Sequence, residues 1–158
     1  MGSILDQLMK ALGSIFFDGE IRRLTRIWVT VKRKAIRSVV KILKDDFGVS
    51  RISMITGLET SHGFEVLYHF ERLNEVQLKE LITIKIRVPR EDPTVDSIVS
   101  VMPGALFYEA ELRDLFGIEL KGYPTLPRIF MSNDTPTPEY SLQKRSPSST
   151  KSSKINRT

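Results

Sequence analysis

Three acidic side chains lie close together in the C-terminal half of the chain, with a guanidinium group among them. Glu109 and Glu111 precede Arg113, and Asp114 follows it directly. Paired carboxylates can act as a general acid and a general base. On a helix Glu111 and Asp114 would share a face, whereas Glu109 would lean toward Arg113 and pair with it. Because no histidine lies near this stretch, structural ion pairing is the favoured interpretation.

The other residue types that carry chemistry do not define an active site. His62 and His69 lack the spacing of a helical metal-binding pair and are interpreted as surface or interface residues. Ser61 beside Glu59 suits ordinary turn chemistry as well as a nucleophile. The sequence has no cysteine, which excludes disulfides and cysteine-ligated zinc, iron–sulfur or nickel centres within it. We expect no catalytic, cofactor-binding or metal-binding residue in this chain.

The charge distribution bears on the class of partner. The 158 residues carry a net charge of +5, which first suggests a nucleic-acid or membrane partner. Residues 132–158 hold five Lys or Arg and two acids, so the body, residues 1–131, keeps only +2. A small basic α+β nucleic-acid-binding domain therefore stays the alternative interpretation. No apolar run is long enough to span a membrane, so we expect no direct membrane span. The order of Asp6 before Lys10 is atypical of a signal peptide.

The first two thirds of the chain predict an α+β domain. A capping box at Ser3 and Asp6 opens a helix that ends near Gly13, and its apolar stripe continues through residues 15–17 toward a protein neighbour. Alternation predicts a strand at 24–32, and an amphipathic helix follows at 33–47 with Arg37 on its solvated face. Three more strands are expected at 51–58, 64–71 and 82–88. The prediction is a four-stranded, mainly antiparallel sheet with helices packed on it.

The remaining third is less regular. A short helix is expected within residues 94–101, and another from Pro103 to Gly117 with an apolar face that includes Leu112 and Phe116. A short strand at 118–121 is followed by an extended arm, whose apolar end at 129–131 is expected to lie on another protein. Residues 1–131 are predicted to form one domain, and residues 132–158 a Ser/Thr/Pro-rich basic tail of disorder-prone composition.

The acidic stretch belongs to a longer motif. Its matching positions are Tyr108, Glu109, Glu111, Asp114, Leu115, Phe116, Gly117, Ile118, Gly122, Pro124, Leu126, Arg128 and Ile129, with Phe130 directly after them. This pattern resembles the signature of the 30-kilodalton subunit of respiratory complex I, a family that includes the equivalent subunit of membrane-bound nickel–iron hydrogenases. The resemblance covers most of residues 21–131. Ala110, Tyr123 and Pro127 depart from the pattern, and residues 138–144 keep at most a remnant of the family's later segment.

The departures favour a divergent member, such as the equivalent subunit of archaeal membrane-bound hydrogenases or sulfur-reducing complexes. The resemblance implies a cofactor-free structural subunit on the cytoplasmic face of the cell membrane, with nickel–iron or iron–sulfur centres in its partners. Those partners are a large 49-kilodalton-like or hydrogenase large subunit, a small iron–sulfur subunit and membrane subunits, and no nucleic acid.

The resemblance also assigns roles to individual residues. It implies that Glu109, Glu111, Asp114 and Arg128 form ion pairs that cross to another subunit or anchor loops. It further implies that Phe116 and Ile118 are packed. Gly117 would permit a tight turn.

Overall fold

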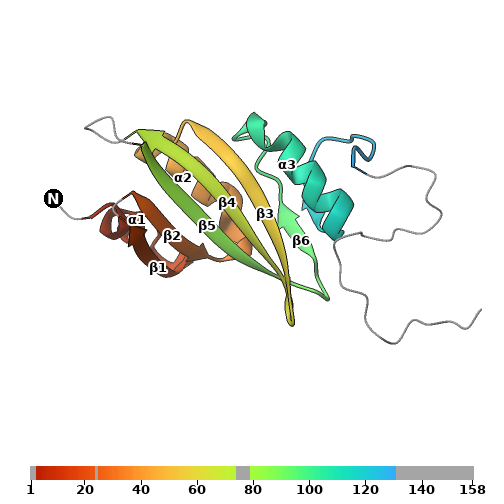
Figure 1. Cartoon of the computed structure of the whole chain (residues 1–158), viewed down its shortest axis with the longest axis horizontal. Helices are drawn as coiled ribbons and strands as arrows, with labels where there is room; N and C mark the ends of the chain where they lie inside the picture. The colour runs from red at the N-terminus through yellow and green to blue at the C-terminus, as the bar shows by residue number, and fades with distance from the viewer. Residues whose placement is uncertain (1–2, 24, 74–78, 131–158) are drawn as a thin grey trace, which may run out of the picture.

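A five-stranded sheet forms the centre of the protein in the computed structural model, which describes residues 3–23, 25–73 and 79–130 (Figure 1). The strand order is β1-β2-β5-β4-β3, and all neighbours are antiparallel except the parallel pair β2 and β5. The strands are β1 (Phe16–Arg23), β2 (Arg26–Val31), β3 (Arg51–Thr60), β4 (Gly63–Leu73) and β5 (Lys79–Pro89). The α+β class and the mainly antiparallel character are confirmed.

The prediction of four strands is wrong by one, because residues 16–23 form β1 rather than extending the amphipathic stripe before them. β1 is an edge strand whose one partner among the described strands is β2, and most of its residues are exposed. An edge strand with both faces largely open shows no alternation of apolar and polar residues, so periodicity cannot reveal it. Gly19 allows the close approach of the first helix, since a Cβ there would lie 2.8 Å from Leu5.

Two helices cover one face of the sheet, in agreement with the prediction that helices pack on it. α1 (Ile4–Leu12) begins with the expected capping box, in which Ser3 and Asp6 bond each other's backbone N–H groups. α2 (Ile36–Phe47) follows a 3-10 turn and ends at Gly48, which adopts φ 65°. Figure 1 shows α2 behind β4 and β5. The α2 residues buried against the sheet are Ile36, Val39, Val40 and Leu43.

The core lies between this helical layer and the inward-facing residues of the sheet. The alternation predicted for the strands is confirmed, because every second residue of the central strands is buried. The inward-facing residues of β2, β4 and β5 are Ile27, Val29, Val31, Phe64, Val66, Tyr68, Phe70, Ile82, Ile84, Ile86 and Val88. Burying one large aliphatic or aromatic side chain stabilises a fold by roughly 1.5–3 kcal/mol, so this layer dominates the stability.

A second, smaller unit follows the sheet. β6 (Thr94–Asp96) pairs in parallel with β7 (Glu119–Lys121), and α3 (Leu106–Glu111) lies between them in sequence. The short helix expected within residues 94–101 is therefore wrong. Residues 94–96 form a strand instead, because they pair with residues 119–121, which lie far along the chain. Thr94 is opposite Glu119 in this pairing. Local propensity cannot anticipate such a pairing.

Arg37 joins this smaller unit to α2. Its side chain donates from Nε to the Ser97 carbonyl at 2.8 Å and from Nη2 to the Lys121 carbonyl at 2.8 Å. The helical pattern predicts Arg37 on the solvated face of its helix, and that interpretation is wrong. The two carbonyls come from the ends of β6 and β7, which are distant from Arg37 in sequence.

Residues 74–78, Met131 and the predicted tail 132–158 lie outside the described residues. The expected strand at 118–121 and the helix stop at Gly117 are confirmed. Ser61 lies in the turn between β3 and β4, as its turn chemistry predicts. Within the described ranges, none of the helices has both the length and the apolar character needed to cross a bilayer.

Candidate functional site

The acidic stretch lies on a helix whose last turn is wider than an α-helix. A 3-10 turn over Pro103–Ala105 leads into α3, and residues Leu112–Phe116 continue as one π-helical turn. Gly117 closes it with φ 70° and donates its N–H to the Arg113 carbonyl. The predicted apolar face is confirmed, since Leu112 and Phe116 are buried. π-turns inside helices are rare and are concentrated at functional sites.

Glu109 is buried inside the chain. Its side chain is fully inaccessible, and it accepts a hydrogen bond from the Ser97 hydroxyl at 2.6 Å and one from the Ile98 N–H at 2.8 Å. Burial raises the pKa of Glu109, although these two donors and the more distant Arg37 favour its charged form. Glu109 therefore ties α3 to the loop that follows β6.

Asp114 is equally buried but binds a different partner. One oxygen, Oδ2, accepts the N–H of Ile129 at 2.7 Å and the N–H of Phe130 at 3.0 Å. The other oxygen accepts from Arg113 Nε at 2.8 Å. Burial opposes the charge of Asp114, but Arg113 and the two N–H groups outweigh it and lower the pKa. Asp114 therefore holds the end of the described arm against the π-turn.

Arg113 reinforces the same attachment. Its two terminal nitrogens donate to the carbonyls of Leu126 and Pro127 at 3.0 and 2.9 Å. Its guanidinium lies 5.2 Å from the ring of Tyr123, whose hydroxyl donates to the Leu106 carbonyl. We use the term arm clasp for Arg113 and Asp114 with the backbone of residues 126–130. The bonds from Arg113 and Asp114 to the arm go to its backbone groups, so they do not engage the apolar side chains of Leu126, Ile129 and Phe130.

The predicted pair between Glu109 and Arg113 is wrong, because each residue faces a different part of the chain. Glu109 points into the interior and Arg113 toward the arm. The face expected to be shared by Glu111 and Asp114 is also wrong, since Asp114 is buried while Glu111 is half-exposed. Arg128 is half-buried next to the clasp. Loop anchoring describes Glu109 and Asp114, since each accepts backbone N–H groups from a distant segment. Asp114 also forms an ion pair, with the adjacent Arg113.

The other motif residues divide into buried and exposed sets. Phe116 and Ile118 are packed in the core, and a Cβ on Gly57 would lie 2.7 Å from the Phe116 ring. Tyr108 donates its hydroxyl to the Ser53 carbonyl at 2.7 Å. Leu115 is half-buried, Gly122 turns the chain at φ 79°, and Pro124 is exposed.

The apolar side chains of the arm remain accessible. Leu126, Ile129 and Phe130 keep 37%, 44% and 45% of their surface exposed. Exposure of three neighbouring apolar side chains to water is unfavourable. The polar clasp, rather than burial of these side chains, holds the arm in place. The arm thus presents an apolar edge on a fixed backbone.

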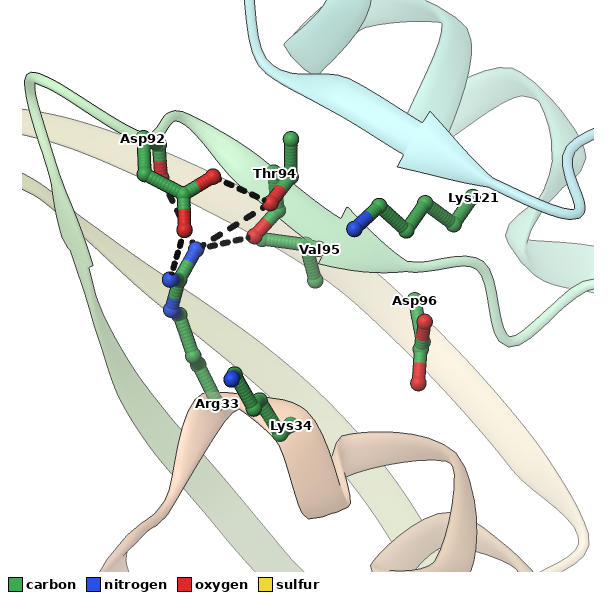
Figure 2. A pocket seen from close by; sticks show the side chains of 7 residues that line it. All are labelled: Arg33, Lys34, Asp92, Thr94, Val95, Asp96 and Lys121. Atoms are coloured by element: carbon green, nitrogen blue, oxygen red, sulfur yellow. Dashed lines mark hydrogen bonds and ion pairs between the residues drawn. The ribbon is translucent and has the colours of Figure 1, made fainter.

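A polar cavity of about 290 Å³ lies between the start of α2 and the β6–β7 pair (Figure 2). Arg33 bonds the Asp92 carboxylate and donates to the Thr94 carbonyl at 2.6 Å. Arg33 and Thr94 lower the pKa of Asp92 to about 2. Lys34, Asp96 and Lys121 surround the rest of the opening. This cavity holds charged groups of both signs and no pairing that suggests acid–base chemistry.

The two histidines lie at different places on one hairpin. His62 is exposed in the turn, whereas His69 lies within β4, where burial lowers its pKa. The His69 ring is 3.0 Å from the Thr83 hydroxyl and packs edge-on against Trp28. Among the described residues, no three carboxylate or imidazole groups gather closely enough to hold a metal ion.

Sequence reasoning missed Ser97, Ile98 and Arg37, which complete the surroundings of Glu109. No local signal identifies them, because they come from a loop and from another helix. The motif itself carried the one available indication, since an acidic residue that is buried in a helix needs a polar partner elsewhere in the fold.

The fold is similar to those of two solved structures. It superposes on a chain in the structure of the membrane-bound sulfane sulfur reductase, an archaeal respiratory membrane complex, with a TM-score of 0.76 over 88% of this chain and 81% of that one, at 22% identity. It also matches the trypsin-resistant fragment of Nqo5, with a TM-score of 0.65 over 78% of this chain and 96% of the fragment, at 26% identity.

The sequence identifies the family. The profile of the respiratory-chain NADH dehydrogenase 30 Kd subunit matches residues 29–152, and the chain belongs to this family. It is 32% identical over 111 residues to the C subunit of the NADH-quinone oxidoreductase of Citrifermentans bemidjiense, covering 68% of this chain and 67% of that protein. The equivalent protein of Herpetosiphon aurantiacus is 33% identical, with coverage of 67% and 63%. The chain thus spans about two thirds of the length of these relatives.

Proposed function

We propose that this chain is a non-catalytic structural subunit in the peripheral arm of a complex I-like, membrane-bound oxidoreductase. It would lie on the cytoplasmic side and be held to the membrane through other subunits. Membership of the 30 Kd subunit family supports this assignment, as does the likeness in fold to a chain of an archaeal respiratory membrane complex. Its contribution to the complex is interface area and the positioning of a catalytic neighbour.

The arm clasp is the observation that carries the proposal. Asp114 and Arg113 fix the backbone of residues 126–130 while the apolar side chains of the arm stay accessible. A buried carboxylate and a guanidinium that bind an external segment stabilise the core little, but they pre-order that segment for binding. Pre-ordering strengthens association because less conformational freedom is lost when the partner binds. The arm is therefore the proposed contact with the large subunit.

The partners follow from the same assignment. We propose a 49-kilodalton-like or hydrogenase-type large subunit as the neighbour of the arm, together with a small iron–sulfur subunit and membrane subunits. The nickel–iron or iron–sulfur centres and the coupling to ion translocation would belong to those partners. Electron transfer then depends on this chain only through the geometry it imposes on them.

A mild-detergent affinity purification from native membranes tests the assignment, with mass spectrometry of the recovered proteins. We expect the large, iron–sulfur and membrane subunits of one redox complex. The double variant Ile129→Ser/Phe130→Ser should lower recovery of the large subunit about 10-fold or more, since two apolar anchors are worth at least about 1.4 kcal/mol together. Leu73→Ser, another exposed apolar residue, is the matched control. Recovery of the wild-type chain alone or with nucleic-acid machinery would contradict the proposal.

A further inference from the structure

Basic side chains from separate parts of the sequence meet at one end of the sheet. β2 and β5 are parallel, so their carboxyl ends lie at the same end of the sheet. Lys32 follows β2, and Lys85 and Arg87 lie on the last part of β5. They line a groove of about 400 Å³ together with Arg33. Arg33 also lines the adjoining cavity of Figure 2, to which Lys34 and Lys121 belong. We call the two hollows together the basic groove.

The basic groove has an excess of positive charge. Three carboxylates line it, those of Asp18, Asp92 and Asp96, and Glu65 adds a fourth by approaching two of the cations from one side. Against these four stand six cations, which are Lys32, Arg33, Lys34, Lys85, Arg87 and Lys121. Charge collected in a hollow, rather than spread over the surface, raises the local potential for an anionic partner.

Several of these cations are only loosely paired. Lys85 and Arg87 share Glu65 at 3.6 and 3.5 Å, which is longer than a close ion pair. Lys32 and Lys34 are exposed and form no ion pair with any residue in the described ranges. Arg33, by contrast, forms hydrogen bonds with Asp92 and Thr94, which fix its side chain between the two hollows. A ligand carboxylate can therefore bind Lys32, Lys34 or Lys85 without first breaking a buried pair.

An aromatic side chain stands at the mouth of the groove. Phe17 on β1 is 66% exposed, and the Lys32 ammonium lies 6.0 Å from its ring centre. The ring gives an apolar contact beside the cations, which suits a side chain rather than a phosphate. The carboxylates interleaved with the cations would repel the continuous negative charge of RNA or of an anionic membrane. Separate carboxylates on a peptide can avoid them.

We infer that the basic groove docks an acidic segment of a partner protein, with carboxylates on Lys32, Lys34 and Lys85 and an apolar side chain on Phe17. The inference rests on the proposed function, since it requires a neighbouring subunit. It adds a second contact, electrostatic in character and distinct from the apolar arm. One part of the groove borders β1 through Phe17 and Asp18, whereas the part shown in Figure 2 borders β6 and β7.

Zero-length carbodiimide cross-linking of the complex in native membranes tests the inference, because this reagent joins amines to carboxylates in direct contact. We expect Lys32, Lys34 or Lys85 to be joined to Asp or Glu of another subunit. The variant Lys32→Ser/Lys34→Ser should reduce that product at least about 10-fold, whereas Lys41→Ser on α2, outside the groove, should leave it unchanged. Cross-links from these lysines confined to carboxylates of the same chain would overturn the inference, even where the complex is recovered intact.

A binding experiment with the purified full chain makes the two proposals separable. The probes are a labelled peptide of glutamates around one phenylalanine, an oligouridine, and vesicles of phosphatidylcholine with phosphatidylglycerol. We expect salt-sensitive binding of the peptide that falls at least about 5-fold in Lys32→Ser/Lys34→Ser and in Phe17→Ser. Stronger binding of the oligouridine or the vesicles, or equal peptide binding by these variants, would overturn the inference whether or not a redox complex is found.

Discussion

Glu109 and Asp114 are two fully buried carboxylates five residues apart, yet their environments give them opposite properties. Glu109 accepts from a hydroxyl and one backbone N–H, and its pKa is raised. Asp114 accepts from a guanidinium and two backbone N–H groups, and its pKa is lowered. Desolvation therefore outweighs the hydrogen-bond donors at Glu109, whereas at Asp114 the donors overcome it. Asp114 also has a cation, Arg113, in direct hydrogen-bond contact, which favours its charged form.

The two sites also differ in what they hold together. Glu109 joins α3 to the loop after β6, both of which pack on the main core. Asp114 joins the helix to a segment that has almost no core of its own. We therefore expect changes at Glu109 to affect the whole fold and changes at Asp114 to affect chiefly the arm.

The largest effect is expected for Glu109→Ala. The substitution leaves the Ser97 hydroxyl and the Ile98 N–H without an acceptor and opens a cavity, so the free energy of unfolding should fall by about 3 kcal/mol. Glu109→Gln keeps the volume and one acceptor and should cost about 1 kcal/mol. Urea unfolding of both variants measures the difference. Equal losses for Ala and Gln would mean that the hydrogen bonds contribute nothing.

Asp114→Ala should cost less in global stability, about 1–2 kcal/mol, because the arm's N–H groups can turn to water once released. Its main effect should appear at the arm itself. Protection of the Ile129 and Phe130 amides against hydrogen exchange should fall about 10-fold or more, while amides of β4 and β5 keep theirs. Glu111→Gln, on the same helix but half-exposed, serves as the control and should change neither quantity. Uniform loss of protection across the sheet would argue against a local clasp.

Acidification should separate the two carboxylates because their contributions have opposite signs. The folded pKa of Asp114 lies below its ordinary value of 3.8, so its contribution is present above that value and is lost as the pH falls through the folded pKa. The folded pKa of Glu109 lies above 4.5, so its contribution is complete below that value and is lost as the pH rises through the folded pKa.

Below about pH 4, the Ile129 and Phe130 amide resonances should therefore move toward disordered positions before the sheet unfolds. Nuclear magnetic resonance titration of the amides measures this order of events. In Asp114→Asn the arm transition should vanish, and in Glu109→Gln it should persist. An arm that stays ordered until global unfolding would show that Asp114 does not control it.

The smallest effect is expected for Arg113→Lys. An ammonium keeps the charge next to Asp114 but cannot reach both the Leu126 and Pro127 carbonyls with a planar fork. The free energy of unfolding should fall by about 0.5 kcal/mol, and exchange of the arm amides should rise about 2- to 5-fold. Differential scanning calorimetry with hydrogen exchange measures both. If Arg113→Lys lowered the free energy of unfolding as much as Asp114→Ala, the guanidinium hydrogen bonds would be the main contribution to the arm clasp.

Much of the fold was predictable because its signals are local. The alternation in β2, β4 and β5, the capping box of Ser3 and Asp6, and the glycines that end α2 and the π-turn each depend on neighbours within a few residues. The exposed edge strand β1 and the short strand β6 were missed. One lacks a buried face, and the other exists only because β7 lies beside it.

The sequence alone determined the family, the α+β class and the positions of the acidic motif, because residue types at fixed spacing carry that information directly. Only the tertiary structure decided that Glu109 faces Ser97 and Ile98, that Arg37 joins two units, and that Asp114 holds the arm. These contacts link residues from 11 to 84 positions apart. Burial and hydrogen-bond geometry at such separations follow from the packing of whole elements, which no local pattern specifies.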